Sequence, residues 1–362
     1  MKGSLTIGKV AGIRIAIHWT FVLLILYVVI ARYREGADSM QIFWSVALVM
    51  SVFVTVVLHE LGHALTGKIF HISTKDITLL PIGGVARMER IPEKPGEELA
   101  VAIAGPLVNL LIAALTLFFV SIKDVLIFIR EPDMIIGSDN FLYNFFAVNV
   151  FLFVFNLIPA FPMDGGRVLR ALLTFTSNRK TATVIAARIG QLLAAGFVIL
   201  GFYQNPFLIF IGLFIMFGAQ SELEMVTTGF ILKGRIIGDA VLRNYEQIHS
   251  TDTVNHAVQK LLDGTSKTFL VTENGLPIGV LGRSQIIRAL AEGKNETQVK
   301  EIMNAHLLSF DHKTPIVDVM QQLNEGAHEM VLITREGKFI GVVDAENILE
   351  YVMVIAADSR AK

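Results

Sequence analysis

The sequence predicts a polytopic α-helical membrane protein with six transmembrane helices and small membrane-associated β-hairpins, followed by a soluble α/β domain. Only 17% of its 362 residues are charged, whereas charged residues make up about a quarter of a typical soluble domain. The deficit is uneven, because residues 1–225 contain long apolar runs while Asp, Glu, Lys and Arg occur throughout residues 236–362. The charged part also contains two copies of one sequence pattern.

Six apolar segments approach the length of about 20 residues that a membrane-spanning helix needs. The uncharged run over residues 189–221 is too long for one span, and the polar residues before Pro206 divide it in two. Proline suits the first position of a helix, where its missing N–H is not needed. As an alternative, the first segment would be a signal-peptide core, but no small-x-small cleavage site precedes Arg32. The predicted spans are 15–31, 42–67, 99–122, 141–163, 182–203 and 206–226.

The distribution of Lys and Arg predicts the orientation, because these residues favour cytoplasmic loops. With six spans, one side of the membrane receives 15 of them and the other side receives four, namely Arg32, Arg34, Lys123 and Arg130. We therefore expect a multi-pass protein of the cell membrane whose N- and C-termini are both cytoplasmic.

Composition excludes other classes of protein and site. The formal net charge is −1, which argues against a nucleic-acid partner, because such binders carry a basic patch. The chain contains no cysteine, so disulfides and thiolate metal sites are excluded.

Two segments beside the predicted spans have the pattern of β-hairpins. Apolar residues nearly alternate over residues 5–17 around a glycine-bounded turn. Residues 77–88 form two apolar arms around Pro81, Gly83 and Gly84. The second hairpin offers an edge to an unwound peptide strand, as in β-augmentation, or alternatively packs on the lipid surface.

The soluble part contains an internal repeat. The segment "TFLVTENG" (268–275) corresponds to "MVLITREG" (330–337), and "PIGVLGRSQIIRAL" (277–290) corresponds to "FIGVVDAENILEYV" (339–352). Each copy has the pattern helix, strand, turn, strand, helix. We expect a membrane domain over residues 1–230 and two repeat domains over 236–295 and 296–362, packed as one pair.

The segment "TVVLHELGHAL" (55–65) places ionisable residues at the end of an apolar run. Residues four apart lie on one face of a helix, so His59 and His63 can chelate one metal ion. His-Glu-x-x-His on a helix is the signature of zinc proteases, in which the glutamate, here Glu60, is the general base. The alternative is two unrelated histidines at the membrane surface, but ionisable residues inside a membrane are costly and usually functional.

A catalytic zinc ion usually has three protein ligands, so a third must come from elsewhere. Asp164 follows the fourth span in "NLIPAFPMDGGR". The predicted topology puts the ends of the second and fourth spans on the same side, where Asp164 can meet His59 and His63. Taken alone, Asp164 would equally be a turn residue in Asp-Gly-Gly.

The motifs "HELGH", "AGPLVN" (104–109) and "NLIPAFPMDGG" together resemble the site-2 protease family of intramembrane zinc metalloproteases over about residues 1–230. The resemblance implies that His59, His63 and Asp164 bind one Zn²⁺ per subunit and that Glu60 is catalytic. It also implies that Asn109 lies near the site and helps to hold substrate. The implied substrate is a transmembrane protein, cut in or near its membrane segment within the lipid bilayer.

The repeats resemble a pair of cystathionine-β-synthase (CBS) domains, which commonly bind adenosine nucleotides between the two copies. That family often has Thr and, three residues on, the ribose-binding Asp. These places hold Gly282 and Gln285 in the first copy and Asp344 and Asn347 in the second. Both ribose carboxylates are missing, so we expect regulation or homodimer formation through the pair, and weak or absent binding of an adenosine nucleotide.

The alternative function is a CBS-gated metal-ion transporter or channel, with His and Asp lining an ion path. Transporters tend to have repeated halves, whereas the two polar motifs here differ, and transport does not need Glu60. A third possibility is a catalytically inactive relative that only binds its partner, but the intact general base Glu60 argues against it. The sequence therefore favours a membrane zinc metalloendopeptidase.

Overall fold

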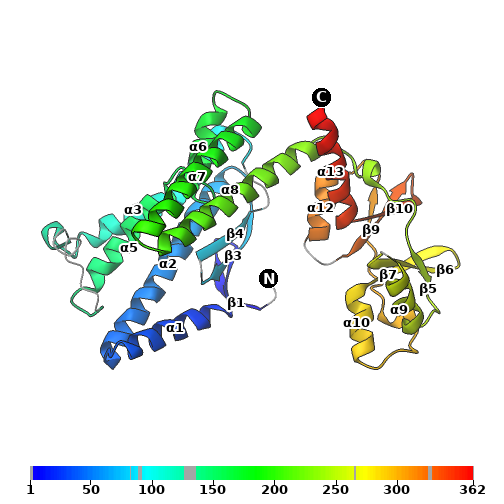
Figure 1. Ribbon diagram of the computed structural model, residues 1–362, viewed down its shortest axis with the longest axis horizontal. Coiled ribbons are helices and arrows are strands. Elements are labelled where there is room, and N and C mark those ends of the chain that lie inside the picture. Colours follow the sequence, from blue (N-terminus) through cyan, green and yellow to red (C-terminus); the bar gives the residue numbers. More distant parts are fainter. Residues whose placement is uncertain are drawn as a thin grey trace. The chain divides into compact units, whose positions relative to one another are not determined.

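The computed structural model describes residues 3–81, 83–88, 92–125, 136–264, 266–324 and 328–361. Some predictions involve residues outside these ranges. They are Ile82 in the second predicted hairpin, and Lys2, Arg90 and Arg130 among the cations used to predict the membrane orientation. The chain forms two compact units, Met1–Val226 and Thr227–Lys362 (Figure 1).

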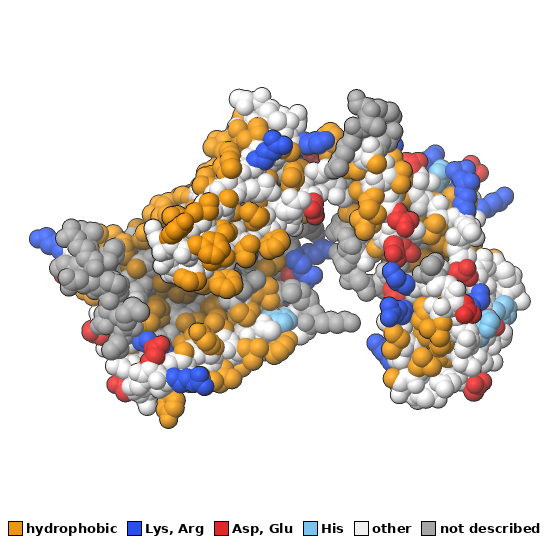
Figure 2. Space-filling model, viewed as in Figure 1, with side chains coloured by type: hydrophobic (Ala, Val, Ile, Leu, Met, Phe, Trp, Pro, Cys, Tyr) orange, Lys and Arg blue, Asp and Glu red, His pale blue; other side chains and the backbone are white. Residues whose placement is uncertain are grey.

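Apolar helices build most of the first unit. Within the described residues, four helices are long and apolar enough to cross a membrane: α2 (Ser39–Ile69), α3 (Pro95–Thr116), α7 (Arg179–Tyr203) and α8 (Phe207–Leu232). Two apolar helices are shorter, α1 (Phe21–Arg34) and α5 (Phe141–Asn156). Large hydrophobic side chains stay exposed on these helices, for example Leu115, Phe202 and Phe217. Orange hydrophobic side chains cover much of the visible surface of this unit in Figure 2. A lipid-facing surface accounts for this exposure, because a soluble monomer rarely exposes large apolar patches.

Three predicted spans have a wrong end. The first was placed over 15–31, but Ile13–His18 forms strand β2 and α1 begins only at Phe21. Ile13, Ile15 and Ile17 fit an alternating strand as well as an apolar run, and the segment becomes a strand because β1 and β3 hydrogen bond to its two edges. The third is predicted over 99–122, but α3 ends at Thr116. The fourth was placed over 141–163, but α5 ends at Asn156, since the prolines that follow cannot donate a helical N–H.

Both predicted hairpins are confirmed, and they join into one sheet. Its strand order is β1 (Ser4–Val10), β2, β3 (Thr74–Leu80), β4 (Gly83–Met88). The hairpins meet through a parallel pairing of β2 with β3, which the sequence did not indicate. Ile13 and Ile77 pack against Leu61 and Ala64 of α2, so the sheet lies against the helix that carries the His-Glu-x-x-His motif.

The second unit confirms the repeat. Each copy contributes a three-stranded sheet, in the orders β5-β6-β7 and β10-β9-β8. Leu270 and Val280 of the first copy share one apolar cluster with Met330, Leu332 and Val342 of the second, which makes the copies a packed pair. The elements are η1 (Ile237–Ala240), β5 (Gln247–His249), α9 (Val254–Asp263), β6 (Thr268–Glu273), β7 (Leu276–Gly282), α10 (Arg283–Ala291), α11 (Val299–Ile302), β8 (Ser309–Asp311), α12 (Ile316–Asn324), β9 (Met330–Arg335), β10 (Lys338–Asp344) and α13 (Ala345–Ala361).

Asp76 on β3 is a buried carboxylate that joins three strands. Arg87 on β4 donates to both of its oxygens, and Arg14 on β2 donates to Oδ2 at 3.0 Å. Arg87, with help from Arg14, holds the pKa of the Asp76 carboxyl below its usual value. The folded state therefore binds this proton more weakly than the unfolded state, so the pairing stabilises the fold at neutral pH and is lost as the pH falls through the lowered pKa.

Replacing Asp76 with Asn should lower the unfolding free energy by about 1 kcal/mol at neutral pH, because both arginines are half exposed and regain water. Thermal unfolding in detergent at several pH values measures the effect. The difference from the native protein should shrink as the pH falls below about 4. Asp124→Asn, at an exposed position, is the control, and a pH-independent difference would contradict the assignment.

Candidate metal centre

The structure brings His59, His63 and Asp164 together. The two histidines lie one turn apart on α2, and their Nε2 atoms are 3.1 Å from each other. Asp164 Oδ2 lies 3.2 Å from each Nε2, although 101 residues separate it from His63. All three side chains are buried, and their donor atoms lie within 4.8 Å of one another. Two imidazoles and a carboxylate thus converge on one point.

Hydrogen bonds at the far side of each ring fix which nitrogen faces that point. His63 Nδ1 donates to the Val101 carbonyl oxygen at 2.7 Å, and His59 Nδ1 donates to Asn109 Oδ1 at 2.6 Å. A carbonyl oxygen only accepts, so Nδ1 carries the proton and Nε2 of the neutral ring is left with its lone pair. This is the arrangement of metal-binding histidines, whose second nitrogen donates to an oxygen of the protein.

One face of α3 supports both rings. Val101, Gly105 and Asn109 follow one another at intervals of four residues and therefore lie in a row along that face. A Cβ at Gly105 would lie 2.2 Å from His63 Nε2 and 2.7 Å from His59 Nε2. Only glycine allows α3 to approach the rings closely enough for Val101 and Asn109 to reach them.

Asp164 is the first residue of helix α6 (Asp164–Thr174), which the sequence did not predict. A Cβ at Gly165 would lie 2.3 Å from the Ile158 carbonyl oxygen, and one at Gly166 would lie 2.6 Å from the Phe161 nitrogen. The Asp-Gly-Gly sequence therefore does not mark a turn. Its glycines let the first turn of α6 pack directly on the preceding backbone, which places Asp164 beside the histidines.

A cavity of about 730 Å³ adjoins the three side chains. Glu60, Asn156 and Arg167 line it together with residues of β4 and α8. A Cβ at Gly84 would lie 2.8 Å from Glu60 Cγ, so strand β4 passes directly over Glu60. The cavity has room for several residues of a peptide beside Glu60.

Asn109 lines this cavity but is fully buried, and its side chain is turned towards His59. Its amide nitrogen reaches Asn149 Oδ1 at 3.5 Å. The structure gives Asn109 a supporting contact to a histidine. The substrate-holding role that the family resemblance implies for Asn109 stays a prediction. The sequence analysis did not identify the Val101 carbonyl or Gly105 as part of the site. Gly105 inside "VAIAGPLVN" was the one signal for a close helix contact.

The donor set suits zinc. Catalytic zinc sites have three protein ligands drawn from histidine and carboxylate, with a fourth position left for water or substrate. Here two Nε2 lone pairs and one carboxylate face each other beside a cavity, and no cationic side chain is hydrogen bonded to Asp164 among the described residues.

Comparison with known proteins gives two family matches. The model of peptidase family M50 matches residues 47–127 and 122–200, and the CBS domain model matches residues 237–292 and 299–354. A zinc metalloprotease of Methanocaldococcus jannaschii is 32% identical over 365 residues, covering 100% of both chains. A putative zinc metalloprotease of Synechocystis is 27% identical over 381 residues, covering 99% of this chain and 97% of that protein. The solved site-2 protease from M. jannaschii is 39% identical, with a TM-score of 0.45, and covers 61% of this chain and 95% of that one.

Gly105→Ala should remove bound zinc. The added methyl group would occupy the space between the two Nε2 atoms and force α3 away from α2. Elemental analysis of the purified protein measures zinc content. The matched control is Gly196→Ala on α7, where a Cβ would meet nothing within 4 Å. Full zinc content in Gly105→Ala would show that the metal lies elsewhere.

Proposed function

Because the chain belongs to peptidase family M50, a family of zinc metalloproteases, we propose that it hydrolyses peptide bonds in or near the transmembrane segments of other membrane proteins. The observation that carries the proposal is the buried cluster of His59, His63 and Asp164 beside Glu60, inside a unit whose helices are apolar on the outside. A soluble substrate would not need such a surface.

In this proposal, His59 Nε2, His63 Nε2 and Asp164 hold one zinc ion per subunit. When bound, zinc would supply Lewis-acid polarisation of the scissile carbonyl. Glu60 lies one residue after His59 and lines the cavity. It takes a proton from the attacking water and then gives it to the leaving amine. Asn109 and the Val101 carbonyl hold the two rings in place throughout, because they bind the nitrogens that face away from the cavity.

Strand β4 is the proposed guide for the substrate. It is the outer strand of the sheet, so one of its edges has no partner strand among the described residues. It also passes over Glu60 at Gly84. A transmembrane helix hides its peptide bonds in its own hydrogen bonds, so the segment to be cut must unwind, and an unwound strand can add to the β4 edge. The other role of this hairpin, packing on lipid, stays open.

For the membrane topology we propose six spans, with α1 and α5 added to the four long helices. At 1.5 Å per residue, their 14 and 16 residues extend about 21 and 24 Å, less than the 30 Å of a typical hydrocarbon core. Local thinning of the bilayer and the flanking arginines of α1 would compensate. The Lys and Arg distribution supports cytoplasmic termini for this arrangement.

The CBS pair is proposed to regulate cleavage or to form a homodimer. Its nucleotide site carries negative charge, which supports weak binding of adenosine phosphates. Ser284 donates to Glu329 Oε1 at 2.9 Å, and a Cβ at Gly282 would lie 1.3 Å from Glu329 Oε2. A carboxylate of the chain itself therefore sits at the start of α10, where threonine often stands in this family.

Glu60→Gln should abolish cleavage and keep the metal. The amide has the size of the carboxylate but cannot accept the proton, and loss of general-base catalysis costs about 10²–10⁴-fold. Cleavage of a transmembrane substrate and zinc content should be measured together, with Asp164→Ala as the variant that loses zinc. Near-normal cleavage by Glu60→Gln would overturn the mechanism, and a transporter would be insensitive to the change.

Deletion of residues 236–362 should change the cleavage rate if the pair is regulatory. Full-length and shortened protein are compared on one substrate, with and without ATP, at fixed zinc. ATP should bind weakly to the native pair, and Gln285→Asp together with Asn347→Asp should strengthen its binding. Equal rates in all four conditions would rule out regulation and leave dimer formation.

A further inference from the structure

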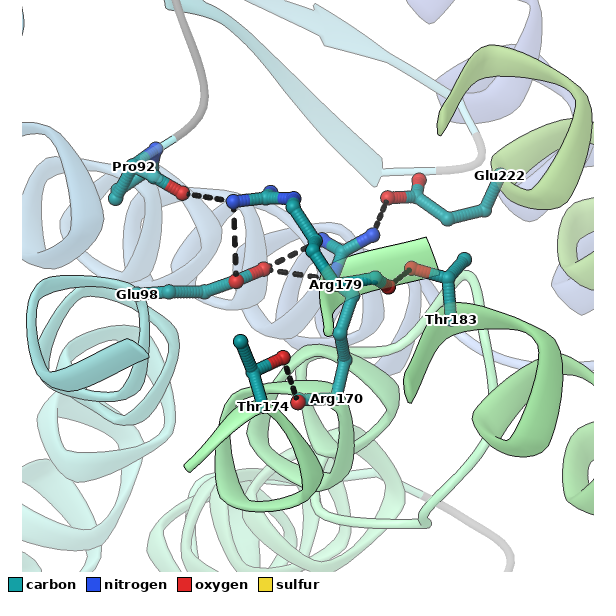
Figure 3. Close-up of polar contacts among 7 residues, drawn as sticks. All are labelled: Pro92, Glu98, Arg170, Thr174, Arg179, Thr183 and Glu222. Atoms are coloured by element: carbon teal, nitrogen blue, oxygen red, sulfur yellow. Dashed lines mark hydrogen bonds and ion pairs between the residues drawn. The ribbon is translucent and has the colours of Figure 1, made fainter. Parts of the chain in front are cut away.

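A cluster of charges, buried at its centre and partly exposed at Arg179 and Glu222, lies beside the metal centre. It is formed by Glu98, Arg170, Arg179 and Glu222 (Figure 3). Arg170 is fully buried and Glu98 is 2% exposed. Arg170 Nε donates to Glu98 Oε1 at 2.8 Å, and its Nη1 donates to Glu222 Oε1 at 2.5 Å. Arg179 Nη1 lies 3.5 Å from Glu98 Oε2. The two arginines and two glutamates balance in charge.

Burying these charges is expensive, and the ion pairs by themselves are no evidence of added stability. Taking each ion out of water costs several kcal/mol, and apolar replacements for such groups are often neutral or stabilising. The proposed reaction uses none of the four as ligand or base. Charges that are costly to bury inside an apolar unit usually have a function. Since these four do not take part in the reaction, we looked to the position of the groups that do.

The cluster connects the helix that carries Asp164 to the helix that supports the two histidines. Arg170 lies on α6, the helix that begins with Asp164. Glu98 lies on α3, one turn before Val101, whose carbonyl holds His63. The Arg170–Glu98 pair therefore fastens the helix of Asp164 to the helix that supports both histidines. Glu222 adds a contact to α8.

The glycines that follow Asp164 in the first turn of α6 cannot fasten the helix in this way. Gly165 and Gly166 have no side chains, so they allow close packing but supply no directional bond. After Asp164 itself, Arg170 is the first residue of α6 for which the structure gives side-chain ion pairs to other helices. Its guanidinium carbon also lies 5.0 Å from the centre of the Phe161 ring. Its planar group, with several donors in fixed geometry, can hold two carboxylates in set directions, whereas the lysine ammonium is a point charge on a flexible stem.

We infer that Arg170 and Glu98 are positioning residues that set the place of Asp164 relative to His59 and His63, and thereby the affinity of the site for its metal. This rests on the proposed function, in which Asp164 is a ligand. Groups that orient metal ligands typically contribute 10–100-fold in metal affinity. The same loss is expected when the Arg170–Glu98 pair is broken.

The test uses two variants of the full chain, Glu98→Gln and Arg170→Lys. Glu98→Gln keeps the size of the side chain, and Arg170→Lys keeps the charge, so the second remains informative if the first does not fold. The matched controls are Glu97→Gln, whose carboxylate pairs with Lys94 at the surface, and Arg188→Lys, which is exposed. Zinc affinity is measured by competition with a chelator, and the unfolding temperature of the metal-free protein is measured beside it.

Both variants should bind zinc 10–100-fold more weakly than the native protein, and the controls should bind it normally. The metal-free unfolding temperature should fall in Glu98→Gln, which leaves the buried Arg170 without one of its carboxylates, and should fall less in Arg170→Lys. Excess zinc should restore cleavage in both variants, because Glu60 and the ligands are intact. Native zinc affinity in both variants would overturn the inference. So would weak binding that excess zinc cannot rescue and that comes with a large loss of metal-free stability, since that describes a purely structural pair.

Asp164→Ala, measured in the same series, separates this inference from the proposed function. If Asp164→Ala loses zinc while Glu98→Gln and Arg170→Lys keep it, only the positioning role fails. If Asp164→Ala keeps zinc, the proposed ligand set itself is wrong.

Discussion

The close contact of α3 with α2 is the constraint on which the rest of the membrane unit depends. Gly105 lets the backbone of α3 approach both histidine rings, and this approach brings the Val101 carbonyl and the Asn109 amide within hydrogen-bonding distance of them. Each ring is then fixed with Nε2 towards the same point. Because an unpaired polar group in an apolar interior costs several kcal/mol, these bonds also make it affordable to bury two histidines. Gly105 of α3 is thus a requirement of the chemistry.

The third ligand depends on a second set of close contacts. Backbone packing at Gly165 and Gly166 starts α6 beside the histidines, and the Arg170–Glu98 pair ties α6 back to α3. One helix, α3, therefore contacts all the elements that present the candidate ligands. The sheet completes the site from the other side, since β4 crosses Glu60 and lines the same cavity. A rigid site in which the acid–base group faces free space is suited to hydrolysis of a bound peptide.

Local pattern explains which parts of this architecture the sequence predicted. Helical spacing placed His59 and His63 on one face, alternation gave both hairpins, and self-similarity gave the paired repeats. Asp164 was predicted from the membrane topology, because the ends of the second and fourth spans had to lie on the same side.

The parallel β2–β3 pairing, helix α6 and the Arg170–Glu98 pair were not predicted. They depend on contacts between residues far apart in the chain, 72 residues in the case of Arg170 and Glu98, and periodicity carries no information about such pairs. The first span began too early because Ile13, Ile15 and Ile17 satisfy both an apolar run and an alternating strand, and only the neighbouring strands decide between them.

The central claim is that one zinc ion is held by His59 Nε2, His63 Nε2 and Asp164, with each Nδ1 bound to the protein. Zinc-edge anomalous diffraction from crystals of the zinc-loaded protein tests it most directly. The account predicts a single strong peak about 2.0–2.2 Å from both Nε2 atoms and from a carboxylate oxygen of Asp164. A peak bound through Nδ1, or one that leaves Asp164 out, would contradict it.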